Sequence, residues 1–419
     1  MNETPPVSAA VRQEIAAIAR NDWGRLVASL IGLLGDFQLA EDSLQDALES
    51  ALRHWTRNSV PQNPPGWLLL TARRKAIDRI RRSRNFERKS GEYARLIDLD
   101  HETADSEIMP EIPDERLALI FTCCHPALEA KSRIALTLRT LGGLATGEIA
   151  RSFLDTETAM AQRLVRAQRK IRDAAIPFAV PERSLWPERL DSVLSVLYLV
   201  FSEGYAASEG DDRLRHDLCT EAIRLARILD SLIPDEPEVE GLLALMILHD
   251  SRKAARLGND AIPVSLAEQD RSLWDREAIS NGLALVIRAL SRGRPGPYQL
   301  QAAISAIHSE ASSHDETGWQ EIVLLYDQLH AMKPNPIVLL NRAVALSCLA
   351  GAETGLANLA GLEAELEDYQ PYHAAKADML SRAGKINEAS IAYDKAIQLS
   401  QNRPDRLFLE KKKRKMQAG

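Results

Sequence analysis

The residues best suited to binding chemistry lie between Pro61 and Lys89. Nine basic and two acidic side chains give this stretch a net charge of +7, in a chain of 419 residues whose formal net charge is −7. The basic residues are Arg73, Arg74, Lys75, Arg79, Arg81, Arg82, Arg84, Arg88 and Lys89. Guanidinium and ammonium groups concentrated in this way bind phosphate oxygens, so the stretch indicates an anionic polymer as partner. A solvated basic helix is the alternative interpretation.

A helix must position these charges. Pro64, Pro65 and Gly66 interrupt the preceding segment, so we predict that the helix begins at Trp67. Its apolar face is expected to consist of Leu69, Leu70, Ala76, Ile77 and Ile80.

The segment before it, residues 8–55, also has helical periodicity. The core-facing stripe is Ala40, Leu44, Ala47, Leu48, Ala51, Leu52 and Trp55. The opposite face carries Glu41, Asp42, Gln45, Asp46 and Glu49. An acidic face is unlikely to contact the same polyanion as the basic helix, so it is either a solvated surface or a docking site for a basic partner.

A change of charge follows the basic helix. Residues 98–115 hold eight acidic side chains, no Lys or Arg, and two prolines, which predicts an acidic linker over 96–115. Helical periodicity then returns over 116–176. We predict a short helix capped by Thr146, a turn near Asp155, and a longer helix from about Thr156.

The longer helix combines an apolar stripe with basic residues. The stripe is Met160, Leu164, Ala167 and Ile171, and the basic residues are Arg163, Arg166, Arg169, Lys170 and Arg172. Two helices joined by a tight turn, the second one basic, are typical of a helix-turn-helix, although many helical corners look alike. Such a helix fits the major groove, where arginine binds guanine edges.

Helical periodicity along the chain predicts an all-α protein, and the composition is that of an ordinary soluble globular protein. Hydrophobic residues make up 45% of the chain and charged ones 26%, and its most apolar run is too short to span a bilayer, which predicts a cytoplasmic protein without membrane contact. Four cysteines do not form a disulfide framework. We find no phosphate loop or nucleophile elbow. His249-Asp250 and Cys123-Cys124-His125 are weak candidates for metal ligands, so no enzyme, cofactor or metal is expected.

The C-terminal part, residues 177–419, is predicted to be a helical solenoid. Ala343 and Ala377 are 34 residues apart, the tetratricopeptide period, and repeats are legible over about 336–402. Earlier helices are expected to complete the array, because at least three repeats are usually needed for stability.

The order of these motifs resembles the extracytoplasmic-function sigma factors of bacterial RNA polymerase. Residues 40–55 resemble the family's segment that docks on the polymerase clamp, residues 67–82 the segment that melts and reads the −10 element, and residues 163–167 the helix that reads the −35 element. The resemblance covers about residues 10–176. Where many relatives have asparagine after the equivalent of Arg73, this chain has Arg74, so no base preference at the −10 strand is inferred.

The resemblance implies a sigma region 2 over 1–95, a sigma region 4 over 116–176, and three sets of binding residues. The −10 set is Trp67, Arg73, Arg74, Lys75, Asp78, Arg79, Arg81 and Arg82. The −35 set is Thr158, Gln162, Arg163, Arg166, Arg169 and Lys170. The set for core polymerase is Glu41, Asp42, Gln45, Asp46 and Glu49. The implied partners are core RNA polymerase and promoter DNA.

Three C-terminal motifs, residues 201–206, 248–252 and 269–275, are similar to a subgroup of these sigma factors with a tetratricopeptide-like extension. In that subgroup the extension, which would bind an unknown ligand or protein, is thought to set activity. The alternative function is a helix-turn-helix regulator with a tetratricopeptide sensor, which binds operators without joining polymerase. That alternative does not require residues 40–82.

Overall fold

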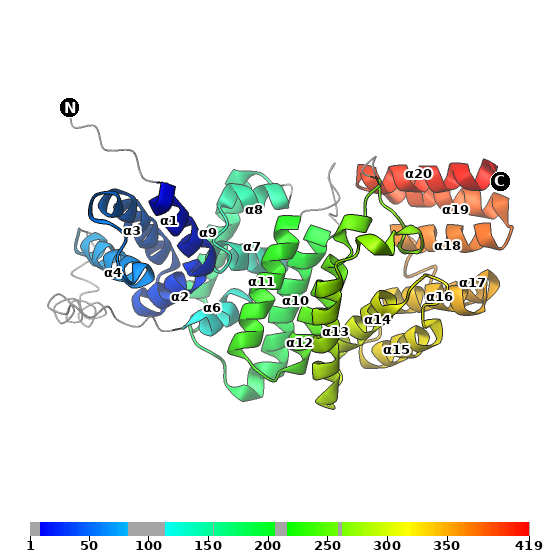
Figure 1. Cartoon of the computed structure of the whole chain (residues 1–419), viewed down its shortest axis with the longest axis horizontal. Helices are drawn as coiled ribbons and strands as arrows, with labels where there is room; N and C mark the ends of the chain where they lie inside the picture. Colours follow the sequence, from blue (N-terminus) through cyan, green and yellow to red (C-terminus); the bar gives the residue numbers. More distant parts are fainter. Residues whose placement is uncertain (1–8, 83–113, 154, 206–215, 259–261, 419) are drawn as a thin grey trace. The chain divides into compact units, whose positions relative to one another are not determined.

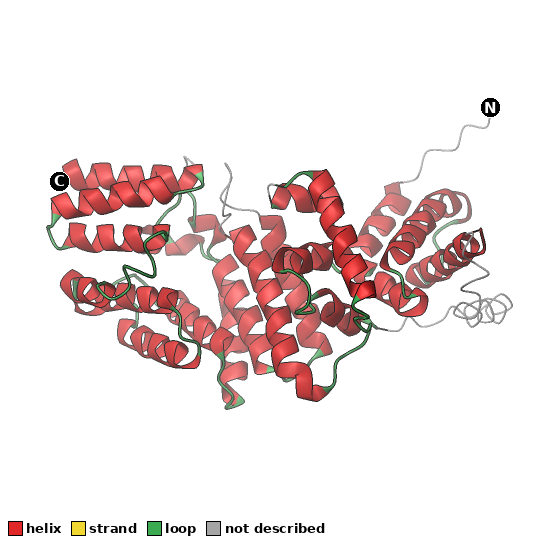
Figure 2. Cartoon of the chain, turned by 180° about the vertical axis from the view of Figure 1, so that it is seen from behind, coloured by secondary structure: helices red, strands yellow, loops and turns green. Residues whose placement is uncertain are grey.

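The computed structural model describes residues 9–82, 114–153, 155–205, 216–258 and 262–418. Within these ranges every regular element is a helix, apart from an isolated β-bridge between Leu257 and Pro263 (Figure 2). The predicted all-α fold is confirmed. None of the described helices is long and apolar enough to cross a bilayer.

The chain divides into two compact units, Met1–Val196 and Leu197–Gly419. The boundary falls inside a helix, α10 (Trp186–Tyr205), rather than in a loop. The predicted acidic linker, except for its last two residues, and the basic residues Arg84, Arg88 and Lys89 lie outside the described ranges.

The first unit contains eight described helices before α10 (Figure 1). They are α1 (Ala9–Asn21), α2 (Trp23–Leu34), α3 (Phe37–Asn58), α4 (Pro64–Arg82), α6 (Arg116–Cys123), α7 (Ala130–Thr140), α8 (Thr146–Ser152) and α9 (Glu157–Asp173).

Helix α3 follows the predicted pattern. The Asp36 carboxylate caps its N-terminus by accepting a hydrogen bond from the Leu39 amide at 3.0 Å. The residues Ala40, Leu44, Ala47, Ala51 and Trp55 are buried, whereas Leu48 and Leu52 at the edge of the stripe are half-buried.

Helix α4 begins at Pro64, three residues before the predicted start. Proline is tolerated in the first turn of a helix because its missing N–H would have no intrahelical partner there. The side-chain oxygen of Asn63 accepts a hydrogen bond from the Gly66 amide at 3.0 Å and so satisfies another free donor. The buried face is Gly66, Leu68, Ala72, Ala76, Ile77 and Ile80, with Leu69 and Leu70 half-buried.

Helices α8 and α9 are joined by a short connection, as predicted, but one cap differs. Thr146 is the first residue of α8 and not its cap; the Glu148 carboxylate accepts from the Ala145 amide at 2.7 Å. Thr156 caps α9, its hydroxyl accepting from the Ala159 amide at 3.1 Å. The predicted stripe is confirmed, since Met160, Leu164, Ala167 and Ile171 are buried.

Helix α2 packs closely against α6 and α7. A Cβ atom at Gly24 would lie 3.0 Å from the carbonyl oxygen of Leu141, and one at Gly143 would lie 3.0 Å from the ring of Trp23. Gly143 also has a φ of +70°, which favours glycine. We call this contact the α2–α7 seam; it joins helices α1–α4 to helices α6–α9.

The first half of α10 completes the core of the first unit. Arg189 donates to the carbonyl oxygen of Phe121 at 2.6 Å, and the Ser192 hydroxyl donates to that of Cys124 at 2.6 Å. Cys123 and Cys124 are buried, and burial raises the pKa of Cys124 to about 11. Both cysteines are therefore structural thiols at neutral pH.

The second unit contains the remainder of α10 and helices that pack mainly on their neighbours in sequence. They are α11 (His216–Leu232), α12 (Pro237–Asp250), α13 (Arg276–Ser291), α14 (Pro297–Glu310), α15 (Trp319–Met332), α16 (Pro336–Ala350), α17 (Ala352–Leu359), α18 (Gln370–Arg382), α19 (Ile386–Leu399) and α20 (Arg403–Ala418). Short 3-10 turns lie between α12 and α13, among them η2 (Lys253–Ala255) and η4 (Arg271–Leu273).

The region where repeats are legible forms consecutive helix pairs, α16 with α17 and α18 with α19. Ala343 and Ala377, at equivalent positions of the two pairs, are both fully buried. Small residues at these positions let the helices approach closely. Gly384, with a φ of +74°, lies in the turn between α18 and α19.

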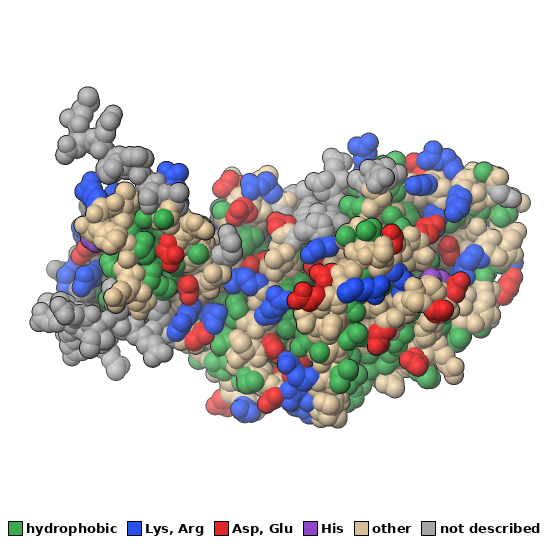
Figure 3. Space-filling view, viewed as in Figure 1, with side chains coloured by type: hydrophobic (Ala, Val, Ile, Leu, Met, Phe, Trp, Pro, Cys, Tyr) green, Lys and Arg blue, Asp and Glu red, His purple; other side chains and the backbone are tan. Residues whose placement is uncertain are grey.

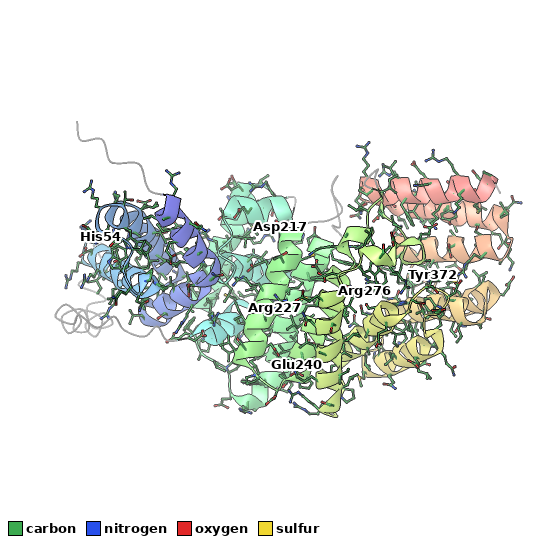
Figure 4. All side chains as sticks on the ribbon, viewed as in Figure 1. His54, Asp217, Arg227, Glu240, Arg276 and Tyr372 are labelled. Carbon is green, nitrogen blue, oxygen red and sulfur yellow. The ribbon has the colours of Figure 1, made fainter. Side chains whose placement is uncertain are left out.

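The centre of the second unit is held by α12, which packs on both α13 and α14. Glu240, 1% exposed, accepts hydrogen bonds from Arg292 at 2.8 and 3.0 Å. Gly241 follows it, and a Cβ atom there would lie 2.8 Å from the backbone nitrogen of Gln299 on α14. The side chain of Glu240 is labelled in Figure 4.

We predict that Gly241→Ala destabilises the second unit by about 1–2 kcal/mol, because α14 must move away and this overpacking exceeds the gain in helix propensity. Gly361→Ala is the matched control, because no atom lies within 4 Å of the added Cβ and the change should lie within about 0.5 kcal/mol. Urea unfolding followed by circular dichroism measures both. Equal stability of the two variants would show that α12 and α14 are not in close contact.

Candidate nucleic-acid interface

Helix α4 presents a basic surface opposite its buried face. Arg74, Arg81 and Arg82 are exposed together with Asp78, and Arg73, Lys75 and Arg79 are half-buried. Figure 3 shows basic and acidic side chains side by side on this part of the molecule. The exposed guanidinium groups can bind phosphates without rearrangement of the helix.

Trp67 lies in the first turns of α4 against α3. Its ring stacks on His54 with centroids 5.5 Å apart, and it meets Trp55 edge-on at 5.4 Å. Trp55 is buried, whereas His54, labelled in Figure 4, is exposed and Trp67 is half-buried. The exposed part of this aromatic pair is suited to stacking against an unpaired base.

Arg79 connects the basic helix to the acidic face of α3. It donates to Asp42 at 2.9 Å and to Asp46 at 2.7 Å, and all three side chains are between 34% and 39% exposed. Exposed pairs of this kind contribute about 0.2–1 kcal/mol each. The two predicted binding sets, one for DNA and one for polymerase, therefore meet at Arg79, while Gln45 and Glu49 remain exposed on α3.

Glu41 was expected on the acidic surface, and this placement is wrong. The residue is 3% exposed and accepts a hydrogen bond from Arg139 of α7 at 2.9 Å. Arg139 also donates to the carbonyl oxygen of Leu144 at 3.2 Å. Burial raises the pKa of Glu41 above its ordinary value, and Arg139 opposes that shift. Glu41 therefore belongs to the α2–α7 seam and not to a docking surface.

Helix α9 turns a continuous polar face to solvent. Thr158, Gln162, Arg166 and Arg169 are exposed at helical spacing, with Lys170 beside them, and Val165 on the same face is 59% exposed. An exposed valine between polar side chains offers an apolar contact of the kind that reads a thymine methyl group. The sequence prediction did not include Val165.

Arg163 differs from the other members of the −35 set. It is half-buried and donates to Asp155, in the turn before α9, at 3.0 Å. This hydrogen bond lowers the pKa of Asp155. Glu129 lies 4.0 Å from the same guanidinium. Arg163 therefore fixes the turn and is not presented for base contact, in contrast to its predicted role.

Sequence reasoning missed the ion pair between Glu41 and Arg139. One signal was present, because Glu41 lies four residues after Phe37 and three before Leu44, on the edge of the apolar stripe. No local signal marked Arg139, whose partner is 98 residues away.

We predict that Arg139→Met destabilises the first unit by about 3 kcal/mol at pH 8, because it leaves Glu41 buried without a partner. Without Arg139 the pKa of Glu41 rises further, so the folded state binds more protons than the unfolded state above pH 4.5. The free energy of unfolding then falls as pH rises, and the loss should be smaller at pH 5. Denaturant unfolding at both pH values measures this difference.

Arg53→Met is the matched control for this prediction. Arg53 lies 4.0 Å from Glu49, and both side chains are about two-thirds exposed. Its loss should change stability by less than about 0.5 kcal/mol at either pH. If Arg139→Met lowers the free energy of unfolding by the same amount at pH 5 and pH 8, ionised Glu41 is not the source of the loss.

Two regions of the chain match known families. Residues 21–86, which span α2 to α4, match the family described as Sigma-70 region 2, and residues 189–290 match a family of unknown function (DUF6596). The uncharacterized protein R00370 of Rhizobium meliloti (strain 1021) is 41% identical over 385 residues, which cover 91% of each chain. The chain therefore belongs to the same family as R00370, with a sigma-70 region 2 domain at its N-terminus and a DUF6596 domain behind it.

Proposed function

We propose that this protein is a sigma factor of the extracytoplasmic-function type, which binds core RNA polymerase and directs it to promoters. The observation that carries the proposal is the coincidence of the sigma-70 region 2 match with helices α2–α4, where an acidic face on α3 adjoins a basic face on α4. A region of this kind acts by binding and not by covalent chemistry. The proposed function places the protein in the cytoplasm.

The acidic face of α3 and the basic face of α4 suit two different partners. Asp42, Gln45, Asp46 and Glu49 on α3 suit a basic surface of polymerase. The exposed arginines of α4 suit the phosphates of the −10 region, and Trp67 suits an unstacked base. Holding flipped bases costs a few kcal/mol per step, which phosphate contacts must offset.

Helices α8 and α9 act as a helix-turn-helix for the −35 element. The exposed side of α9 would enter the major groove, with Arg166 and Gln162 near its centre and Val165 between them. Arg169 and Lys170 lie farther along and suit phosphates.

Promoter binding requires the α2–α7 seam to open. The positions −10 and −35 differ by about 25 base pairs, which corresponds to about 85 Å along the DNA axis at about 3.4 Å per base pair. A compact unit of 196 residues has a radius of gyration of about 16 Å and is thus roughly 40 Å across. Helices α4 and α9 therefore reach both elements only after Glu41 and Arg139 separate.

The second unit modulates this opening. We favour a role in supporting the active arrangement, because α10 continues without a break from the first unit, where Arg189 and Ser192 bind the carbonyls of Phe121 and Cys124, into the second unit. Its helix pairs α16–α17 and α18–α19 are of the tetratricopeptide type and offer a surface for a ligand or protein.

We predict that the full chain with core polymerase starts transcription at promoters that core alone ignores, measured by run-off synthesis. Asp42→Asn combined with Asp46→Asn should weaken capture by core polymerase by about tenfold or more, since two charge contacts are lost. Arg79→Ala is the matched control: it breaks the same intramolecular pairs but keeps both carboxylates, so polymerase capture should persist while promoter affinity falls.

Two results would argue against this assignment. Loss of polymerase capture in Arg79→Ala as well would show that the carboxylates only hold α4 in place. Sequence-specific binding to duplex DNA without any capture of polymerase would favour a conventional helix-turn-helix regulator.

We also predict a difference between two neighbouring arginines of α9. Arg166→Ala should weaken binding by about 1–3 kcal/mol and relax base preference at one −35 position, because the side chain is exposed on the reading face. Arg163→Ala should lower thermal stability but leave base preference unchanged, because its partner is Asp155. Binding to a panel of −35 sequence variants measures the base preference of both proteins, and thermal unfolding measures their stability. The reverse assignment of effects would show that α9 presents a different face.

A further inference from the structure

Six basic side chains, three arginines and three histidines, gather in the second unit. They come from the end of α12, the segment between α12 and α13, the end of α14 and the turn after it. We call them the cationic cluster: His249, Arg252, Arg256, Arg271, His308 and His314. The three motifs at 201–206, 248–252 and 269–275 converge here, and none has a role in the sigma function described above.

Tyr205 at the end of α10 forms one side of the cluster. The Arg256 guanidinium lies over its ring, 3.3 Å from the centroid, and Arg256 also donates to its carbonyl oxygen. Arg252 donates to its hydroxyl at 3.3 Å, and the ring of His249 lies 5.0 Å away. Two guanidinium groups and one imidazole therefore share one aromatic side chain.

Trp274 links this side to Arg271. The guanidinium carbons of Arg271 and Arg252 lie 4.6 and 5.8 Å from its ring. Arg271 is fixed through one nitrogen, which donates to the carbonyl oxygens of His308 at 2.7 Å and Ala311 at 2.6 Å. Arg276, labelled in Figure 4, donates to the carbonyl oxygen of Arg271 at 3.3 Å. The backbone thus holds the fork of Arg271 in a fixed orientation.

Several buried polar atoms of the cluster lack hydrogen-bond partners among the described residues. They are Arg252 Nε, Arg271 Nη2, Trp274 Nε1, His308 Nδ1 and His314 Nδ1. Arg252 is 6% exposed and Trp274 3% exposed. The nitrogens of Arg252, Arg271 and Trp274 are donors, and buried donors are nearly always satisfied in folded proteins, so these unsatisfied ones indicate a missing acceptor.

The electrostatic surroundings are consistent with this interpretation. Burial lowers the pKa of His308 to about 3, and the next causes are Arg252, Arg271 and His314, all cationic or titrating to cations. The pKa of His249 is likewise far below its usual value, through burial first and then Arg252 and Arg256. Burial lowers the pKa of Arg271, which Arg252 and Arg276 lower further.

The nearest carboxylates by sequence already have partners. Asp250 binds Lys253 at 2.7 Å. Asp270 and Asp275 cap the helical turns that follow them by accepting from the amides of Ser272 and Ala278, both at 2.9 Å. Within the described ranges, no ion pair joins Arg252, Arg256 or Arg271 to a carboxylate.

We propose that the cationic cluster binds the oxyanion of a small molecule, a phosphate or a carboxylate. Arg252 Nε and Arg271 Nη2 are unused donors, and the Nδ1 atoms of His308 and His314 donate in the tautomer that carries the hydrogen there, so together they match the several acceptor lone pairs of such a group. Trp274 and Tyr205 supply apolar walls. The bound charge would offset the cost of burying the arginines. The site lies wholly in the second unit, and its test does not depend on the sigma function.

Thermal unfolding of the full chain in inorganic phosphate, in acetate and in chloride at equal ionic strength tests the proposal. The anion that binds should raise Tm by about 2–4 °C when its concentration is roughly five times its Kd. A response to phosphate or to acetate then identifies the ligand as a phosphate or a carboxylate. Arg252→Gln should abolish the rise, as should His314→Phe, which keeps a ring near Trp319 and removes the ring nitrogens. Arg227→Gln, an exposed position on α11 labelled in Figure 4, should keep it.

Two outcomes would overturn the proposal. The first is an equal rise in the wild type, Arg252→Gln and His314→Phe, which would place the anion elsewhere. The second concerns Glu209, Asp211 and Asp212. If neutralising these residues lowers Tm and creates an anion response that the wild type lacks, the chain's own carboxylates satisfy the cluster and no external ligand is needed.

Discussion

The first unit depends on one buried ion pair, between Glu41 of α3 and Arg139 of α7. A carboxylate that is 4% exposed is stable only because a guanidinium 2.9 Å away compensates for its lost hydration. The pair lies beside contacts in which glycine is required, at Gly24 and Gly143. Under the proposed function this interface separates when promoter DNA is bound, so the ion pair would have to break.

The parts that could be predicted from the sequence are those set by local periodicity. The stripes of α3 and α9 depend on side chains three or four residues apart, and the structure confirms them except at Leu48 and Leu52, which are half-buried. The start of α4 was misjudged because proline breaks a helix in its interior but is favoured in its first turn. The different roles of Arg163 and Arg166 depend on whether Asp155 lies within reach, and helical periodicity carries no information on that.

Long-range electrostatics could not be predicted for the same reason. The cationic cluster brings together residues from 249 to 314, and each of its arginines alone looks like a surface residue. Arg252 and Arg256 are buried, whereas Arg74, Arg81 and Arg82 of α4 are exposed to solvent. The two units thus place the same residue type in different surroundings.

The position of Arg79 between Asp42 and Asp46 has a thermodynamic consequence. A basic surface that takes the two carboxylates releases the guanidinium, and a phosphate that takes the guanidinium releases the carboxylates. Either ligand therefore breaks the same intramolecular pairs, and the second to bind does not have to break them again. By linkage, each partner must raise the affinity for the other by the same factor, which is about fivefold if the two pairs are worth about 1 kcal/mol in total. Under the proposed function, the free protein would hold DNA less tightly than the polymerase-bound protein.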